Sequence, residues 1–131
     1  MKRIFFAILL ILSLILLFSC ANGSYSVLKG YERNTPTSMA MTYEKFNGYK
    51  QKSFTVGEDE RATVYVFVVS SSGELDILIE KDGGEPVYVA NDAVTSSFTI
   101  DITQSGEYNI RVEAKDHTGE YNFEWEIINT K

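Results

Sequence analysis

The chain has 131 residues, with 18 Asp or Glu against 12 Lys or Arg and a formal net charge of −6 at pH 7. This acidic balance argues against a nucleic-acid partner, because phosphate backbones are bound by clustered basic side chains. One cysteine and one histidine make a tetrahedral zinc site improbable and mean that the fold forms without an internal disulfide.

The first nineteen residues have the pattern of an export signal. Two basic residues are followed by an apolar run over residues 4–18, and the small Ser19 closes the segment. The run is shorter than the roughly 20 residues that a membrane span needs. We therefore interpret residues 1–19 as a signal peptide that forms a helix. An uncleaved anchor is the alternative.

The closing sequence Leu-Phe-Ser-Cys, residues 17–20, resembles the lipobox of small bacterial lipoproteins. The resemblance implies cleavage between Ser19 and Cys20 and a covalent diacylglycerol, with palmitate-type chains, on Cys20. Two acyl chains anchor a protein stably to a bilayer. The expected location is the cell membrane, on its extracytoplasmic side. An ordinary signal peptide cut elsewhere is the alternative, but it leaves the thiol of Cys20 free in an oxidising compartment.

Residues 20–38 are predicted to form a lipid-anchored flexible tether. Asn, Gly, Ser and Thr are frequent here, and no hydrophobic period is sustained. A coil of this length reaches about 20–25 Å. Tyr25 and Tyr31 leave open that part of the segment packs on the domain. Because the processed chain carries −8, we expect the body to be repelled from anionic lipid and held away from the membrane.

Residues 39–131 are predicted to form one all-β domain, an antiparallel β-sandwich of jelly-roll or Ig-like type with about 7–8 strands. Short alternating segments with a glycine-containing turn at most breaks are typical of such sandwiches. The expected strands are residues 41–46, 49–56, 62–69, 75–80, 85–90, 97–102, 108–114 and 121–128.

Two hairpins are predicted from residue parity. With residues 115–120 as a loop, Ile110 lies opposite Trp125, and Arg111 lies opposite Glu124 on the other face. In the same register Val112 faces Phe123, Tyr108 faces Ile127, and Asn109 faces Glu126.

The second predicted hairpin has its loop at residues 81–84. This loop places Ile77 opposite Tyr88. Pro86 has no N–H to donate to a neighbouring strand, so residues 85–90 are expected at a sheet edge.

The second half of the chain resembles the bacterial pre-peptidase C-terminal domain. The likeness is carried by residues 75–79, 84–86, 105–112 and 119–121 and extends over residues 52–128. It implies a small non-catalytic β-sandwich of the kind appended to secreted enzymes, some of which bind polymeric substrates. The Ser-Gly-x-Tyr-x-Ile-x-Val pattern at residue 105 is also similar to one in small lipoproteins of Gram-positive bacteria.

Catalytic groups are scarce in this sequence, so we expect no enzyme activity. His117 falls in the predicted hairpin loop, where a solvated side chain is expected, and Cys20 is assigned to lipid. Glu124 and Glu126 lie two apart on one strand, about 6–7 Å from each other. That spacing approaches a glycosidase pair, so a small glycoside-acting hydrolase is an alternative function.

No cofactor is predicted, although a calcium ion at an acidic turn is an open alternative. Residues 57–60, 81–85 and 91–92 concentrate the oxygen ligands that calcium prefers, but none matches the twelve-residue calcium loop.

Three aromatic residues are candidates for ligand contact: Tyr65, Phe67 and Tyr88. Exposed aromatic rings suit glycans, because sugar rings stack on flat faces. For Tyr65 and Phe67 we expect burial instead, because their strand is apolar on both faces. The sequence thus predicts a surface lipoprotein that binds an envelope protein or a wall polymer. A calcium- or glycan-binding module is a further alternative.

Overall fold

The computed structural model describes residues 24–131, so the predicted signal peptide and Cys20 lie outside the described residues. The described part is all-β and antiparallel, which confirms the predicted fold class. None of its residues belongs to a helix long and apolar enough to cross a membrane. The strands are β1 (Tyr25–Leu28), β2 (Tyr31–Glu32), β3 (Ser38–Val56), β4 (Glu60–Lys81), β5 (Pro86–Ala90), β6 (Ser96–Ile102) and β7 (Gly106–Asn129).

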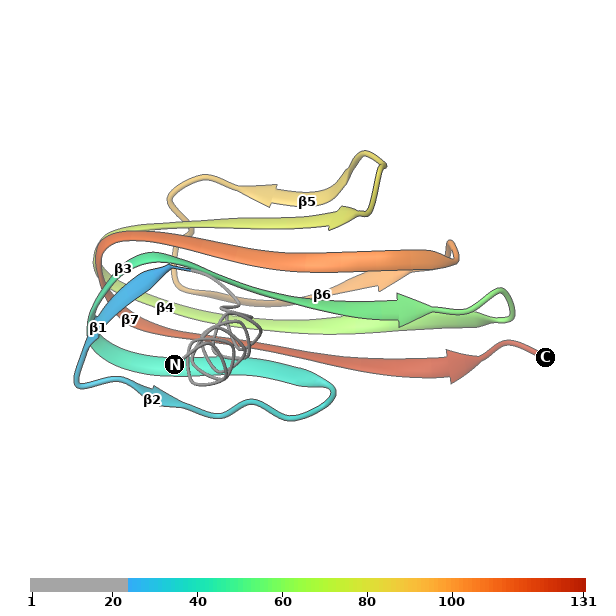
Figure 1. The fold of residues 1–131 in the computed structure, drawn as a ribbon, viewed down its shortest axis with the longest axis horizontal. Helices are drawn as coiled ribbons and strands as arrows, with labels where there is room; N and C mark the ends of the chain where they lie inside the picture. The colour runs from blue at the N-terminus through green and yellow to red at the C-terminus, as the bar shows by residue number, and fades with distance from the viewer. Residues whose placement is uncertain (1–23) are drawn as a thin grey trace, which may run out of the picture.

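The three longest strands, β3, β4 and β7, each bend once and run through both layers of the sandwich (Figure 1). The first layer is ordered β2, residues 38–43 of β3, residues 119–129 of β7, residues 60–70 of β4, and β6. The second layer is ordered β1, residues 48–56 of β3, residues 106–114 of β7, residues 74–81 of β4, and β5.

The bend explains why one predicted hairpin is wrong. Residues 115–120 do not join two paired strands, because β7 continues through them and changes layer. Ile110 pairs with Lys52 and Ile79, while Trp125 pairs with Val64. The inward parity predicted for both side chains is nevertheless confirmed, since both are buried from opposite layers.

The bend of β4 requires a glycine at position 73, for reasons of both backbone conformation and space. Its φ of +75° is a left-handed conformation, and a Cβ at this position would meet the backbone of Asp116 and His117. The neighbouring bends of β3 and β7 contain Gly48 and Gly119. These glycines, which were expected in turns between strands, therefore allow β3, β4 and β7 to bend side by side.

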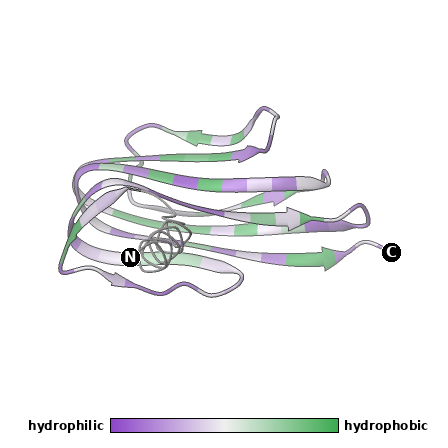
Figure 2. Cartoon of the chain, viewed as in Figure 1, coloured by the Kyte–Doolittle hydropathy of each residue, from purple (hydrophilic) through white to green (hydrophobic). Residues whose placement is uncertain are grey.

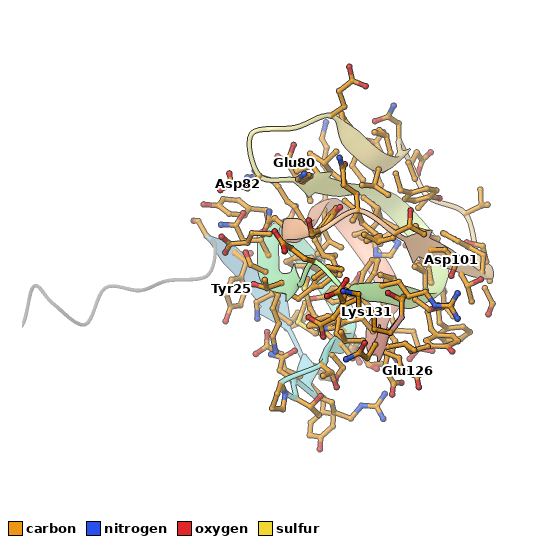
Figure 3. The ribbon with its side chains drawn as sticks, turned by 90° about the vertical axis from the view of Figure 1, so that its right-hand side faces the viewer. Tyr25, Glu80, Asp82, Asp101, Glu126 and Lys131 are labelled. Carbon is orange, nitrogen blue, oxygen red and sulfur yellow. The ribbon has the colours of Figure 1, made fainter. Side chains whose placement is uncertain are left out.

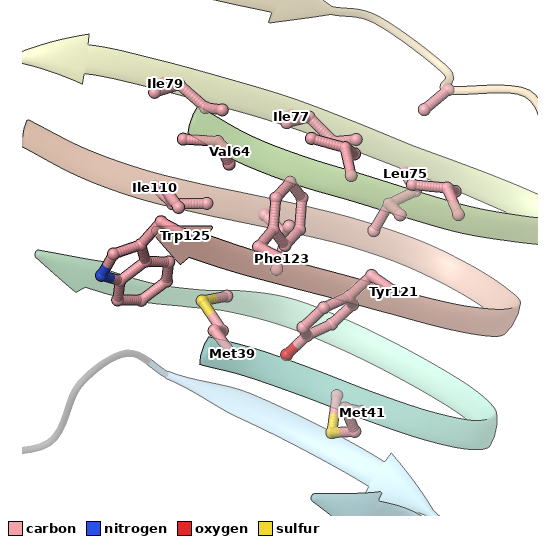
Figure 4. Packing of buried hydrophobic residues seen from close by; sticks show 14 of the residues in the cluster. Met39, Met41, Val64, Leu75, Ile77, Ile79, Ile110, Tyr121, Phe123 and Trp125 are labelled. Atoms are coloured by element: carbon pink, nitrogen blue, oxygen red, sulfur yellow. The ribbon is translucent and has the colours of Figure 1, made fainter. Parts of the chain in front are cut away.

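The core is formed where the two layers face each other. Hydrophobic and polar residues alternate along much of the strands, and the inward set interdigitates between the layers (Figures 2 and 4). The rings of Phe54 and Trp125 stack across the layers with centroids 5.0 Å apart. On the β5–β6 side, Tyr88 and Phe98 make a second contact across the layers, at 5.1 Å.

The second predicted hairpin is present, but its loop is residues 82–85 rather than 81–84 and its predicted register is wrong. Ile77 pairs with Ala90, and Tyr88 pairs with Ile79. The shift is two residues, which leaves every side chain on its predicted face, and an irregularity between Ile79 and Glu80 accompanies it. β5 lies at the edge of the sheet, as Pro86 indicated.

Part of the predicted tether packs on the domain, the alternative that its two tyrosines left open. β1 pairs with residues 45–48 of β3, and β2 pairs with residues 41–42. The Lys50 ammonium lies 4.1 Å from the centroid of the Tyr25 ring and forms an ion pair with Glu32. These contacts explain why a polar segment is ordered against the sheet.

Candidate functional site

The outer face of the first layer carries the two best-placed aromatic candidates. Tyr65 and Phe67 are 46% and 41% exposed, so the expectation that they are buried in the core is wrong. Both lie on β4, whose alternate residues point into the core. Within residues 24–131 no second element covers this face, since the N-terminal strands join the edge of the sheet rather than lying across it.

Polar side chains flank both rings because of the strand order β6, β4, β7. Tyr65 lies between Thr99 and Glu124, and Phe67 lies between Ser97 and Asn122. A shallow hollow is lined by Tyr65, Val66, Phe67, Ser97, Phe98, Thr99, Asn122 and Glu124. We call Tyr65, Phe67, Ser97, Thr99, Asn122 and Glu124 the aromatic face.

An acidic row borders the aromatic face. Thr63 lies between Asp101 and Glu126 and donates a hydrogen bond to Asp101 Oδ1 at 3.0 Å. The hydroxyl of Tyr65 lies 3.5 Å from Glu126 Oε2. Asp101 and Glu126 project from the same side of the sandwich (Figure 3). The site therefore combines flat apolar rings with hydrogen-bond acceptors.

Glu124 and Glu126 lie on this outer face, but not opposite the residues expected. Glu124 pairs with Ser38 and Tyr65 rather than with Arg111, which belongs to the other layer. Asn109 likewise belongs to the other layer and pairs there with Ser53 and Glu80. Both carboxylates are exposed and project from one strand in the same direction.

Tyr88 lies apart from the other two candidates. It is half-buried and pairs with Ile79, a core residue, so its ring faces the inside of the sandwich. On the outer face of the second layer, Tyr49 is covered by Arg111, whose guanidinium lies 4.0 Å from the ring centroid. The uncovered rings of Tyr65 and Phe67 contrast with both.

His117 is fully buried at the bend, so the expectation of a solvated loop histidine is wrong. Its Nδ1 lies 2.5 Å from the Tyr43 hydroxyl, and its Nε2 lies 2.8 Å from Ser70 Oγ. The change arises because residues 115–120 continue a strand into the core instead of forming a loop.

The hydrogen bonds at His117 define one neutral tautomer. The Ser70 hydroxyl donates to the Ala93 carbonyl at 2.6 Å, so the Nε2–H of His117 donates to Ser70 and Nδ1 accepts from Tyr43. Burial lowers the pKa of His117, partly offset by the charge of Asp92. A histidine that donates to the serine cannot take its proton, so this arrangement stabilises the bend and does not activate a nucleophile.

Two of the acidic turns form local hydrogen bonds. In the turn at residues 57–60, Glu60 Oε1 accepts the backbone N–H of Gly57 at 2.9 Å; at residues 91–92, the backbone N–H of Asp92 donates to Oδ1 of Asp76 on β4 at 2.8 Å. Within residues 24–131, no group of three or more His, Cys, Asp or Glu side chains is arranged to hold a metal ion.

Sequence reasoning missed the polar part of the aromatic face. Asn122, Ser97 and Thr99 carry no motif, and their proximity to Tyr65 follows only from the strand order. The available signal was parity: each is polar in a strand whose alternate residues face the core.

The sequence matches no protein-family model and no curated protein. Similar solved structures include tailspike protein 4 of bacteriophage CBA120, at 11% identity and a TM-score of 0.46, covering 82% of this chain and 20% of that one. The N-terminal cellulose-binding domain of a Cellulomonas fimi β-1,4-glucanase C has the same identity and TM-score, covering 82% and 88%. A family 35 carbohydrate binding module from Clostridium thermocellum has 14% identity and a TM-score of 0.42, covering 80% and 92%. At these identities, the similarity concerns the fold alone.

Proposed function

We propose that this protein is a lipid-anchored, non-catalytic surface module that binds a glycan of the cell envelope through its aromatic face. The observation that carries the proposal is the pair of exposed rings, Tyr65 and Phe67, flanked by polar residues of both neighbouring strands. Isolated exposed hydrophobic residues need no explanation, but two adjacent rings above a hollow indicate a binding surface.

The chemistry of the aromatic face suits a sugar better than an apolar ligand. Successive outward residues of one strand are about 6–7 Å apart, so the two rings offer neighbouring apolar surfaces for the C–H faces of sugar rings. Thr99 and Ser97 contribute hydroxyl groups on one side, and Asn122 and Glu124 contribute an amide and a carboxylate on the other. These groups donate and accept hydrogen bonds with sugar hydroxyls.

The experiment is a binding titration of isolated wall polymer and a panel of neutral oligosaccharides. Tyr65→Ala and Phe67→Ala should each weaken binding at least tenfold. Tyr31→Ala is the matched control, because Tyr31 is an exposed tyrosine on β2, away from the aromatic face. Equal binding by all three variants, or no binding by the parent protein, would reject the glycan proposal. Capture of one envelope protein through the same two residues would replace the glycan by a protein partner.

The hydrolase alternative is kept for one reason: Glu124 lines the same hollow as Tyr65. It predicts turnover of a glycoside by the parent protein and its loss in Glu124→Gln. Binding that is retained without turnover across the panel would reject it.

The membrane anchor is the second part of the proposal and is supported by the sequence alone. Cys20 is the only cysteine and directly follows an apolar run and Ser19. Growth with labelled palmitate should label the native chain and leave Cys20→Ala unlabelled. Release of the native protein by salt, without detergent, would contradict a lipid anchor.

A further inference from the structure

A second exposed hydrophobic group lies at the N-terminal corner of the domain. Tyr25, Leu28 and Tyr31 are 49%, 55% and 66% exposed and fall within seven consecutive residues. Lys29 lies between Leu28 and Tyr31, and Arg33 follows Tyr31 by two residues. We call these five residues the N-terminal corner. Figure 3 places Tyr25 on the opposite side of the sandwich from Asp101 and Glu126.

Charge is divided unevenly along the chain. Residues 24–56 contain five Lys or Arg and two Asp or Glu, a net charge of +3. Residues 57–131 contain five Lys or Arg and sixteen Asp or Glu, a net charge of −11. The overall acidity therefore hides a basic segment, and this segment is the one that contains the N-terminal corner.

The ion pairs near the corner are weak competitors for an external anion. Lys29 lies 3.3 Å from Glu44, and Lys45 lies 3.3 Å from Asp116, with all four side chains more than half exposed. Exposed pairs of this kind contribute little and exchange readily with solvent or other ions. Both lysines are thus accessible to a negatively charged surface.

The N-terminal corner is close in the sequence to the proposed membrane anchor, which makes the bilayer the negatively charged surface nearest to it. Tyr25 lies five positions after Cys20 in the sequence, which is at most about 18 Å of extended chain. This inference rests on the membrane anchor proposed above, in which either the apolar run of residues 4–18 or lipid on Cys20 holds the chain at the bilayer. In either case the corner is the described part of the domain that stays nearest to the bilayer.

We propose that the N-terminal corner docks the domain on the anionic surface of its own membrane. Tyrosine suits the membrane interface because its ring is apolar and its hydroxyl remains hydrated. Lys29 and Arg33 extend their charged ends toward lipid phosphates, which attract basic residues close to the surface. This docking revises the expectation of an acidic body held away from the membrane, because only the larger, acidic part is repelled.

Docking at the corner orients the aromatic face. β2 and β4 are separated by β3 and β7 in the first layer, a lateral distance of about 14 Å. β6, the outermost strand on that side, lies farther still from the bilayer. Tyr65 is thereby presented toward the cell wall while the N-terminal strands remain at the lipid.

The test uses full-length protein purified from membranes and reconstituted into anionic vesicles that contain brominated lipid. Tyr31→Trp and Tyr65→Trp each add one indole at an exposed tyrosine, while the buried Trp125 gives the same background in both. We expect the brominated lipid to quench the added fluorescence of Tyr31→Trp at least twofold and to leave that of Tyr65→Trp unchanged. Equal quenching of the two variants, or none in either, would overturn the proposal.

A charge variant tests the basic half of the proposal. Adding Lys29→Glu and Arg33→Glu to Tyr31→Trp should reduce quenching severalfold at low salt. Adding Lys81→Glu and Lys131→Glu, which make the same charge change outside residues 24–56, should not. Indistinguishable quenching in these two backgrounds would overturn the role assigned to Lys29 and Arg33.

Discussion

The bend of the sandwich buries its polar and aromatic side chains, whereas the aromatic face leaves them exposed. At the bend, His117 is hydrogen-bonded to both Tyr43 and Ser70, and the three side chains lie largely within the protein. On the aromatic face, Tyr65 and Phe67 remain exposed beside polar groups that face solvent. We therefore expect the bend to contribute to stability and the aromatic face to the proposed recognition, so that substitutions in the two regions have separable effects.

The largest effect on stability is expected from Gly73→Ala at the bend. The new Cβ would meet the backbone of Asp116, and φ of +75° is unfavourable for alanine. We expect the free energy of unfolding to fall by more than about 4 kcal/mol, which is typical of severe steric conflict. Denaturant unfolding measures this change.

Gly83→Ala is the control for that prediction. Gly83 also has a positive φ, +67°, but a Cβ there would have nothing within 4 Å. The expected loss is therefore only the conformational cost of about 1–2 kcal/mol. Equal losses in the two variants would show that close approach of strands at the bend is unimportant.

A smaller loss is expected from His117→Leu. The substitution leaves the buried Tyr43 hydroxyl without an acceptor and removes a donor from Ser70, at about 2–3 kcal/mol in total. Adding Tyr43→Phe to this variant should restore part of the stability, because the unpaired hydroxyl is then absent. Additive losses in the double variant would contradict the assigned hydrogen bond.

Acid should weaken the bend through the same histidine. Because burial lowers the pKa of His117, the unfolded chain binds a proton before the folded chain does as the pH falls below about 6.5. Stability is therefore complete above that pH and declines below it, by at most about 1.4 kcal/mol per pH unit. His117 is the only histidine, so His117→Leu should flatten the profile between pH 7 and pH 5.5. A slope that persists in the variant would reject this assignment.

The smallest effect on stability is expected on the aromatic face. Tyr65→Ala and Phe67→Ala should each change the free energy of unfolding by less than about 1 kcal/mol, since both side chains are already substantially exposed. Their glycan affinity should fall at the same time. A loss of stability as large as that of His117→Leu would show that the rings belong to the structure rather than to a binding site.

Much of the fold could be predicted because the alternation of hydrophobic and polar residues can be recognised within a single strand. Ile110 and Trp125 were correctly expected on inward faces, since period-two patterns define which side of a strand is apolar. Tyr43 and Phe46 were missed as core residues, because the bulged bend of β3 interrupts the alternation there. The aromatic candidates were predicted, but their exposure was not.

The amino-acid pattern alone was enough to predict the extended segments between residues 41 and 128, most of their inward faces, the edge position of β5 and the residues from which a site could be built. The passage of β7 from one layer to the other, which buries His117 and separates Glu124 from Arg111, became evident only in the folded chain. The exposure of Tyr65 and Phe67 likewise became evident only there. Hydrophobic alternation along a strand predicts which side chains point inward. Which strands pair, and which sheet face is covered, depends instead on contacts between residues far apart in the chain.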